Sequence, residues 1–322
     1  MKKILVTGSA GFIGANVSEM LLKNGYQVVG VDNLNDYYDV NLKLKRLEQL
    51  KKSNHYTFYK TSIENLNELK KIFHDNNLHG VINLAARAGV RYSIKNPIAY
   101  ILTNSIGNLN LLELCREYGI EKFVLASTSS LYAGQKTPFR EELSVNTPIS
   151  PYAVSKKAAE AMTYTYHYLH GLDVTVLRYF TVYGPASRPD MAVFRFIKLM
   201  LEGKSLIIFG DGQQERDFTY VDDIARGTID ALKPLGYQII NLGNNQPCKL
   251  IDMVRFIEKY TGKKAIIKYE KQDRADMEKT WADIKKAKEF LGWGPKIDLE
   301  TGIKKTVEWT KKNWEWISGI QI

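Results

Sequence analysis

The sequence is poor in cysteine and histidine. Of its 322 residues, only two are cysteine and five are histidine. Cys115 and Cys248 lie far apart, without the C-x-x-C spacing of zinc or redox sites, and the histidines form no cluster of metal ligands. These absences argue against a disulfide framework and a metal site, so we expect a metal-free protein of the cytoplasm.

Long apolar runs are also missing. No stretch approaches the roughly 20 apolar residues that a membrane span needs. The N-terminal MKKILVTGSAGFIG has no apolar signal-peptide core or cleavage site after its two lysines. We therefore expect no membrane association and interpret this segment as a first strand. Hydrophobic residues make up 44% of the chain, which is enough to bury the core of one large or two smaller domains.

The chain carries a formal net charge of +10. Such a charge is compatible with nucleic-acid binding. However, the lysines are spread along the chain, and a run such as Lys43, Lys45 and Arg46 is typical of the solvated face of a helix. We therefore expect no nucleic-acid partner. A basic protein also suits an acidic small substrate, although charge alone does not decide this.

Apolar, β-branched segments alternate with amphipathic ones. Helical patterns occur at residues 104–118 and 152–168, and strand-like runs lie at residues 3–7, 27–32, 56–59, 80–84, 122–126 and 173–178. The strands are continuously apolar rather than alternating, which indicates burial on both faces and a parallel sheet. The pattern predicts an α/β protein with a doubly wound, Rossmann-type sheet.

The alternation ends near residue 178, where loops such as VYGPASRPDM and FGDGQQERD begin. We expect residues 1–178 to form the sheet domain, rejoined by part of residues 215–245. YQIINLG, residues 237–243, is the candidate for a returning strand. Residues 179–322 would then form a smaller C-terminal α/β domain that binds the substrate.

A glycine triplet, Gly8, Gly11 and Gly14 in TGSAGFIG, follows the first strand and precedes a helix. Glycines there let the backbone approach a pyrophosphate at the helix N-terminus. Asp32 ends the second strand. A carboxylate there accepts hydrogen bonds from ribose hydroxyls and repels a 2′-phosphate. The arrangement predicts NAD rather than NADP; the alternative is a glycine-rich turn that binds nothing.

Tyr152 and Lys156, in SPYAVSKKAAE, lie four residues apart and share a face if this segment is helical. A nearby ammonium lowers the pKa of a phenol from about 10 and makes it a usable base. The Y-x-x-x-K spacing recurs elsewhere in the chain and is weak alone. Pro151, which suits a helix start, and the hydroxyl-rich ASTSSLY (126–132) single out this pair. Ligands bind beyond the carboxyl ends of such strands, where Thr128 would lie.

Together these motifs resemble the extended short-chain dehydrogenase/reductase family. NLAARAGVRYS (83–93), LRYFTVYGPASRPDMAVF (177–194) and FGDGQQERDFTYVDDIA (209–225) are similar to its nucleotide-sugar 4-epimerases, above all to the branch acting on UDP-glucuronate. The resemblance covers nearly the whole chain. It implies an NAD-dependent isomerase that acts on a UDP-sugar and supplies polysaccharide synthesis. It also implies a homodimer formed through the helices at 104–118 and 152–170.

The resemblance further implies roles for individual residues. Thr128, Tyr152 and Lys156 would be catalytic, with Tyr152 as the base and Lys156 as its electrostatic partner. The cofactor would contact Gly8, Gly11, Phe12, Ile13, Gly14, Asp32, Asn33, Ser62, Ile63, Leu84, Ala85, Ala86, Asn104, Tyr152, Lys156 and Tyr179. The substrate would contact Arg91, Thr128, Ser129, Ser130, Thr181, Arg188, Arg216 and Arg274. The chain departs from its relatives at Ser62–Ile63, where they place an Asp–Ile pair near the adenine.

Ser129 and Ser130 distinguish the branches of the family. Dehydratases carry Asp–Glu directly after the threonine, and decarboxylases carry a Glu two residues after it. With serine at both positions, the resemblance implies reversible hydride transfer alone. Arg188 and Thr181 would hold the sugar carboxylate and so prevent decarboxylation of the keto intermediate. Arg91 is a second candidate ligand of the carboxylate or phosphate, and Arg216 and Arg274 would face the diphosphate.

Two other functions stay open at this stage. A 4-epimerase of neutral sugars, UDP-glucose or UDP-N-acetylglucosamine, would leave Arg188 as a surface residue. A catalytically silent nucleotide-binding sensor is disfavoured by the intact Thr128, Tyr152 and Lys156. Each lone arginine also has a plainer alternative, a surface ion pair.

Overall fold

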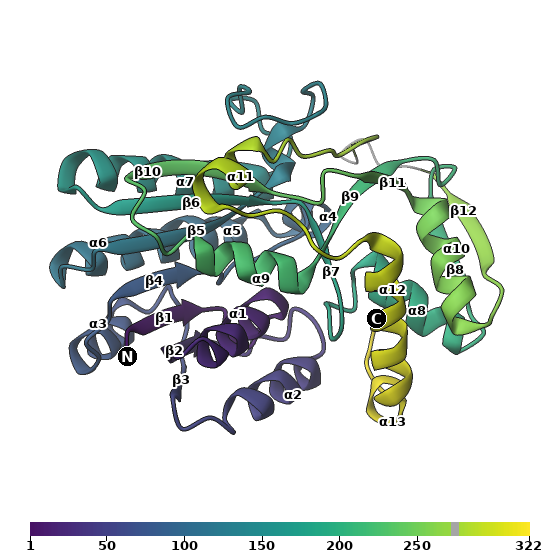
Figure 1. The fold of residues 1–322 in the computed structure, drawn as a ribbon, viewed down its shortest axis with the longest axis horizontal. Coiled ribbons are helices and arrows are strands. Elements are labelled where there is room, and N and C mark those ends of the chain that lie inside the picture. Colours follow the sequence, from purple (N-terminus) through teal and green to yellow (C-terminus); the bar gives the residue numbers. More distant parts are fainter. Residues whose placement is uncertain (272–276) are drawn as a thin grey trace.

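A seven-stranded parallel sheet lies at the centre of the computed structural model, which describes residues 1–271 and 277–322 (Figure 1). Its strand order is β10-β6-β5-β4-β1-β2-β3, and every neighbouring pair is parallel. The strands are β1 (Lys3–Thr7), β2 (Gln27–Asp32), β3 (Tyr56–Lys60), β4 (Gly80–Asn83), β5 (Lys122–Thr128), β6 (Asp173–Tyr179) and β10 (Tyr237–Leu242). The predicted doubly wound α/β fold is confirmed.

Helices cover both faces of this sheet, because neighbouring strand residues are buried on opposite sides. Ile4 and Val6 pack into one core with α1 (Phe12–Lys23), α2 (Val40–Leu50), α9 (Val221–Asp230) and α11 (Lys285–Leu291). Leu5 and Val29 pack into the other with α3 (Leu66–Asp75), α6 (Asn108–Glu117) and α7 (Pro151–His170). The two layers explain why the strands read as continuously apolar.

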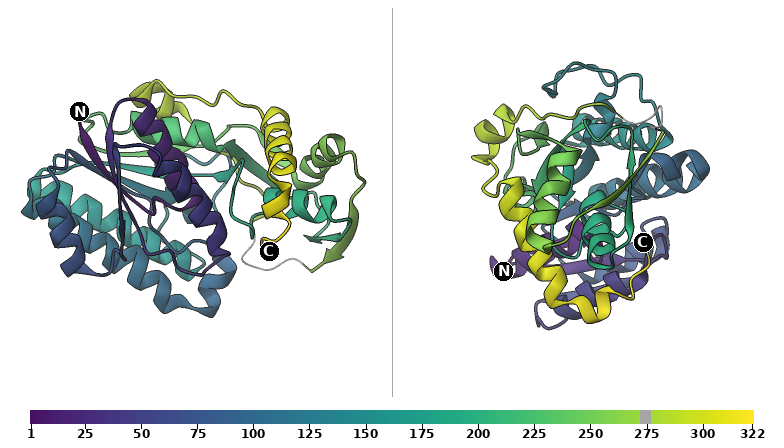
Figure 2. Two further views of the ribbon diagram at one scale, coloured as in Figure 1. Left: turned by 90° about the horizontal axis from the view of Figure 1, so that it is seen from below. Right: turned by 90° about the vertical axis from the view of Figure 1, so that its right-hand side faces the viewer.

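A smaller lobe lies at one end of the large sheet (Figures 1 and 2). It holds a three-stranded sheet of β7 (Thr181–Tyr183), β9 (Glu215–Tyr220) and β11 (Pro247–Lys249), and a parallel pair, β8 (Ser205–Phe209) and β12 (Ile266–Glu270). Its helices are α8 (Ala192–Leu201), α10 (Leu250–Thr261), α12 (Leu299–Lys312) and α13 (Trp314–Ile317). After β9 the chain leaves this lobe and returns to the large sheet, where α9 packs against α1 and β10 pairs with β6. It then enters the lobe again at β11.

Two elements differ from their sequence-based bounds in ways that bear on the site. β5 continues beyond Ala126 because its pairing with β6 extends to Thr128 opposite Tyr179, and the 3-10 turn η2 (Ser129–Tyr132) follows. The helix expected from residue 104 becomes regular only at Asn108. Before it lie α4 (Val90–Lys95), α5 (Pro97–Ile101) and a π-helical segment, η1 (Leu102–Gly107). A Cβ on Gly107 would lie 2.6 Å from the side chain of Ile63, so η1 packs unusually closely against the segment after β3.

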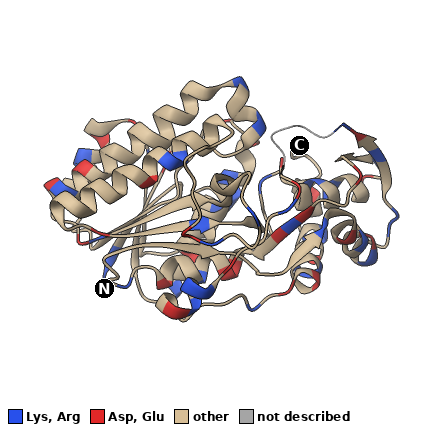
Figure 3. Ribbon diagram, turned by 90° about the horizontal axis from the view of Figure 1, so that it is seen from above, with Lys and Arg blue, Asp and Glu red and all other residues tan. Residues whose placement is uncertain are grey.

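Charged residues of both signs are interspersed over the two lobes (Figure 3). In the described part of the chain, no helix has the length and apolar character of a membrane span. The same residues contain no group of three or more His, Cys, Asp or Glu side chains arranged to hold a metal ion.

Candidate active site

One pocket at the carboxyl ends of the parallel strands brings most of the predicted residues together. It is lined by every predicted cofactor residue except Asn104, and also by Arg188. Further lining residues that the sequence had not singled out include Asn35, Tyr37, Tyr38, Lys43, Glu64, Arg87 and Thr103. The location agrees with the rule that ligands of doubly wound sheets bind beyond the strands' carboxyl ends.

The glycine triplet forms a tight cradle between β1 and α1. Gly8 has a φ of +67°, and a Cβ there would lie 2.8 Å from the backbone nitrogen of Ala85. A Cβ on Gly14 would overlap the carbonyl oxygen of Gly8. The Gly11 N–H donates to that same carbonyl at 2.9 Å. Larger residues would therefore fill the space in which a pyrophosphate can approach the start of α1.

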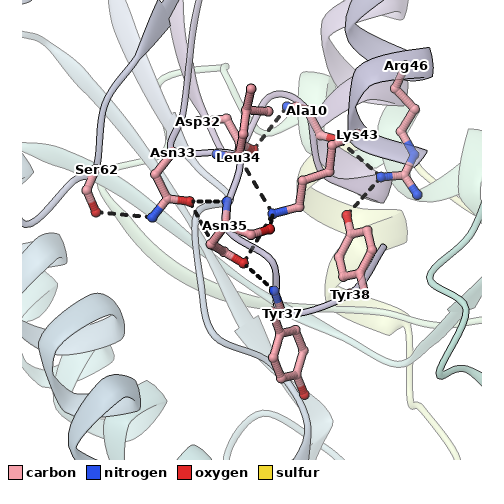
Figure 4. Close-up of polar contacts among 10 residues, drawn as sticks. All are labelled: Ala10, Asp32, Asn33, Leu34, Asn35, Tyr37, Tyr38, Lys43, Arg46 and Ser62. Carbon is pink, nitrogen blue, oxygen red and sulfur yellow. Dashed lines mark hydrogen bonds and ion pairs between the residues drawn. The ribbon is translucent and has the colours of Figure 1, made fainter. Parts of the chain in front are cut away.

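Asp32 lies beside this cradle at the end of β2 and is 8% exposed. Its carboxylate accepts hydrogen bonds from the backbone N–H groups of Ala10, at 3.2 Å, and Leu34, at 2.8 Å (Figure 4). The ammonium of Lys43 is 4.0 Å away and donates to the carbonyl of Asn35 at 2.8 Å. Burial lowers the pKa of Lys43. The strand end thus presents a fixed carboxylate with a buried cation next to it.

The interpretation of the lysine-rich stretch in α2 as a solvated face is wrong for two of its residues. Lys43 and Arg46 are only 4% and 7% exposed. Their helix packs under the segment that follows β2, where Lys43 bonds to Asn35 and Arg46 bonds to Tyr38 (Figure 4). Composition could not reveal this, because the contacts depend on how that segment folds back over α2.

The departure at Ser62 is accompanied by a nearby carboxylate. Asn33 donates to the Ser62 hydroxyl at 3.3 Å, and that hydroxyl donates in turn to Glu64. Thr103 donates to the other carboxylate oxygen of Glu64 at 2.5 Å. Ser62, Glu64 and Thr103 all line the pocket. A carboxylate is therefore present here, two residues after the position at which sequence reasoning looked for it.

Thr128 and Tyr152 meet where β5 ends and α7 begins. Ser150 caps α7 by accepting the Ala153 N–H at 3.2 Å, and Pro151 is the first helical residue. Burial raises the pKa of Tyr152, although a hydrogen bond with Thr128 and the charge of Arg188 oppose the rise. The expected net fall in the pKa of Tyr152 is wrong for this structure, because burial outweighs the groups that lower this pKa. The Lys156 ammonium donates to the carbonyl of Ala126 at 2.8 Å, and burial lowers its own pKa to about 8.

A buried ion pair holds these elements in register. Arg178 of β6 donates to both carboxylate oxygens of Glu160 in α7, at 2.9 and 2.7 Å, and both side chains are 2% exposed. Ser127 of β5 donates to the same carboxylate at 2.6 Å. Glu160 is one turn beyond Lys156 on α7, so this pair fixes the helix that carries Tyr152 against the strand that carries Thr128.

Asn104 does not line the pocket, although it was predicted to contact the cofactor. Its side chain accepts the Arg87 N–H at 2.8 Å and donates to the Arg87 carbonyl and to the Ser155 hydroxyl, each at 2.9 Å. Asn104 therefore connects the loop after β4 to α7 by hydrogen bonds, on the side of the loop that does not face the pocket. Its position in the π-helical η1 matches the frequent occurrence of such segments near functional sites.

The predicted substrate residues separate into two adjoining groups. Arg188 lines the pocket of Tyr152 and Lys156, and it lies 5.3 Å from the ring centroid of Tyr37. It also bonds the Ala88 carbonyl, at 3.3 Å, and pairs with Asp190, at 2.5 Å. Arg91, Thr181 and Arg216 line a second pocket, together with Ser187, Asp190 and Phe209. The two pockets adjoin because both are built on the loop after β7.

The remaining predicted residues are placed less directly. Thr128, Ser129 and Ser130 line neither pocket; the Ser130 N–H donates to the Thr128 hydroxyl at 3.1 Å. Arg274 lies outside the described residues.

Comparison with known proteins finds relatives along the full length. Residues 5–306 match the family model described as GDP-mannose 4,6 dehydratase. A UDP-glucuronate 4-epimerase of Thermodesulfobacterium geofontis is 57% identical over 319 residues, 99% of each chain. UDP-glucuronate 4-epimerase 4 of Arabidopsis thaliana is 42% identical, over 95% of this chain and 74% of its own length.

Several solved structures also have a closely similar fold. The UDP-glucuronic acid 4-epimerase of Bacillus cereus, in complex with UDP-glucuronic acid and NAD, superposes with a TM-score of 0.91 and 39% identity. That match covers 97% of this chain and 99% of the other. The UDP-glucose 4-epimerase of Thermotoga maritima, with UDP-glucose, gives a TM-score of 0.89 and 36% identity over 97% and 99% of the two chains.

Proposed function

Because this chain belongs to the family described as GDP-mannose 4,6 dehydratase, within the extended short-chain dehydrogenases/reductases, we propose that it is an NAD-dependent UDP-glucuronate 4-epimerase. It would interconvert UDP-glucuronate and UDP-galacturonate. One observation carries the proposal. A single pocket unites the glycine cradle, Tyr152 and Lys156 with a cationic Arg188, in a chain 57% identical to such an epimerase.

The residues present fit NAD. The cradle of Gly8 and Gly14 leaves no room for side chains but leaves room for a pyrophosphate, and Asp32 would accept hydrogen bonds from an adenosine ribose. Ser62, with its proton committed to Glu64, would act as an acceptor for the adenine amine. NAD, when bound, supplies the acceptor and later the donor of the hydride at C4 of the sugar.

Tyr152 is the proposed base and acid. Its phenolate oxygen would take the proton of the sugar 4-hydroxyl while the C4 hydride leaves, and Thr128 would hydrogen-bond to both oxygens. The 4-keto sugar would then turn within the site and present its other face. Return of the hydride and of the Tyr152 proton gives the 4-epimer, with no net oxidation. Lys156, buried beside Tyr152 on α7, would stabilise the phenolate through its ammonium.

The sugar carboxylate creates a hazard, because a 4-keto uronate is a β-keto acid that can lose carbon dioxide. Arg188 would hold the carboxylate away from alignment with the ketone, assisted by Thr181 from the adjoining pocket. Arg91 and Arg216, which line that second pocket, would hold the diphosphate, as would Arg274. The serines after Thr128 supply no carboxylate for dehydration or decarboxylation.

One observation favours a second candidate, a neutral-sugar 4-epimerase. Arg188 already forms an ion pair with Asp190, so its charge is partly used within the protein. A UDP-glucose 4-epimerase is also among the similar structures. In that case Arg188 would only shape the loop, and UDP-glucose or UDP-N-acetylglucosamine would be the substrate.

We further propose the division of labour and the assembly. Residues 1–178, rejoined by part of 215–245, would bind NAD, and residues 179–322 would bind the nucleotide sugar. A homodimer would form through the helices at residues 104–118 and 152–170. At this face η1 and α7 expose the large apolar side chains of Leu102, Ile106, Tyr164, Tyr168 and Leu169. Light scattering of the wild type and of Y168E would test it: the wild type should have the mass of two chains and the variant that of one.

A substrate panel tests the proposed function. Purified protein with added NAD is given UDP-glucuronate, UDP-glucose or UDP-N-acetylglucosamine. The products are separated by chromatography and their molecular masses are measured. A new peak of unchanged mass from UDP-glucuronate alone is expected. Turnover of only the neutral sugars would move the assignment to the second candidate. Bound NAD without turnover of any sugar would instead indicate a nucleotide-binding sensor.

A further inference from the structure

Arg46 of α2 is a buried cation without a carboxylate partner among the described residues. Its guanidinium donates to the carbonyl of Ala186 from Nε, at 3.1 Å, and from Nη2, at 2.6 Å. Its Nη1 donates to the Ala10 carbonyl, at 3.0 Å, and to the Tyr38 hydroxyl, at 2.8 Å (Figure 4). All its hydrogen-bond partners are therefore neutral, and two of them are backbone carbonyls from segments far apart in the sequence.

These two carbonyls belong to the two ends of the site. Ala10 lies inside the glycine cradle, and its N–H donates to Asp32 at 3.2 Å. Ala186 lies in the loop after β7, two residues before Arg188. One guanidinium thus joins the segment that would hold the cofactor to the segment that would hold the sugar. A lysine could not do this, because a single ammonium lacks the planar fork that grips one carbonyl with two N–H groups.

Ala186, whose carbonyl accepts two hydrogen bonds from Arg46, has an unusual backbone conformation. We call these two bonds the clamp. Ala186 has a φ of +53°, in the left-handed region that side chains other than glycine rarely adopt. The bonds from Arg46 fix the carbonyl of this residue and so favour the strained conformation. The chain then continues through the fully buried Ser187 to Arg188, which reaches the Ala88 carbonyl and the ring of Tyr37. The direction in which Arg188 leaves the backbone therefore depends on the conformation of Ala186.

We propose that Arg46 is a positioning residue for recognition of the sugar carboxylate. It holds Ala186 in its left-handed conformation, so that Arg188 faces the pocket, and it ties this loop to the cradle that binds NAD. The inference deepens the proposed function and rests on it for the identity of the sugar. The plainer alternative is that Arg46 only stabilises the packing of α2.

The test uses R46K, which keeps the charge and removes the fork. With UDP-glucuronate, KM should rise about tenfold and kcat should change by less than about twofold, since the group acts on binding rather than on chemistry. Inhibition by UDP, which has no sugar carboxylate, should be unchanged. A melting temperature measured for each variant separates this effect from loss of the fold.

Glycine at position 186 supplies the decisive control. Glycine adopts a positive φ without strain, so the loop no longer needs the clamp. A186G alone should leave KM unchanged, and R46K/A186G should recover most of the affinity that R46K loses. An unchanged KM in R46K would overturn the proposal. So would a raised KM that A186G does not lower, because a purely structural role for Arg46 predicts no rescue by glycine.

Two further readouts keep the test conclusive. If R46K does not fold, Y38F removes one acceptor of the guanidinium while keeping the ring, and a smaller rise in KM is expected. If the wild type does not turn over UDP-glucuronate, the proposed function fails and the clamp is tested by crystallography. In R46K the φ of residue 186 should then leave the left-handed region; a retained positive φ would overturn the clamp.

Discussion

The proposed cofactor end and the proposed sugar end of this site are built differently. At the cofactor end, Gly8, Asp32 and Tyr152 lie on or directly after regular elements, and their positions follow from β1, β2 and α7. At the proposed sugar end, Arg91 lies in the short helix α4 and Arg188 in the loop after β7. Their positions depend on contacts with Phe209, Ala88 and Asp190. The difference teaches that local sequence patterns place the residues of the proposed cofactor end, whereas contacts with other parts of the chain place the two arginines.

Tyr152→Phe should cause the largest loss of activity among the changes at the proposed cofactor end. It removes the proposed base for the 4-hydroxyl proton, and kcat should fall by about 10²–10⁴-fold. Binding of NAD and UDP-glucuronate should persist, because the ring remains. Rapid mixing and product chromatography would measure this, with Y269F, at an exposed tyrosine of β12, as the matched control. A fall of less than tenfold would assign the proton transfer to another group.

Arg178→Met should test whether the cofactor end depends on its buried ion pair. The change leaves the Glu160 carboxylate buried and unpaired, which should lower the free energy of unfolding by about 3–5 kcal/mol. R255M, at an ion pair on the surface of α10, is the control and should cost less than about 1 kcal/mol. Urea unfolding of both variants measures the two costs. An equal loss of unfolding free energy in the two variants would show that the buried pair does not stabilise the fold more than a surface pair does.

The pH dependence should sharpen the role of Lys156. Burial lowers its pKa to about 8, so its ammonium is present below that pH and lost above it. If the ammonium stabilises the Tyr152 phenolate, activity should fall as the pH rises through about 8. K156R stays charged and should flatten this alkaline limb, even at reduced activity. K157R serves as control, and an alkaline limb unchanged in K156R would exclude Lys156 as its source.

Local patterns in the sequence predicted which residues assemble at the proposed cofactor end. The strand bounds, the glycine cradle and the Tyr152–Lys156 pair follow from local patterns, and the structure places the pair and the cradle in one pocket. Sequence reasoning did not reveal Lys43, Arg46 or Glu64, because their contacts arise only when the segments after β2 and β3 fold over their neighbours. It also misjudged the pKa of Tyr152, because burial is a tertiary property that a Y-x-x-x-K spacing does not contain.

The products that R188A forms from UDP-glucuronate test the central claim most directly. If the two ends act separately, the cofactor end should still oxidise C4 while the carboxylate is no longer held. The epimer should then fall by about 30-fold or more, the loss expected for a charged contact worth 2–3 kcal/mol, and a product lighter by carbon dioxide should appear. Formation of the epimer at the wild-type rate, without decarboxylation, would contradict the account.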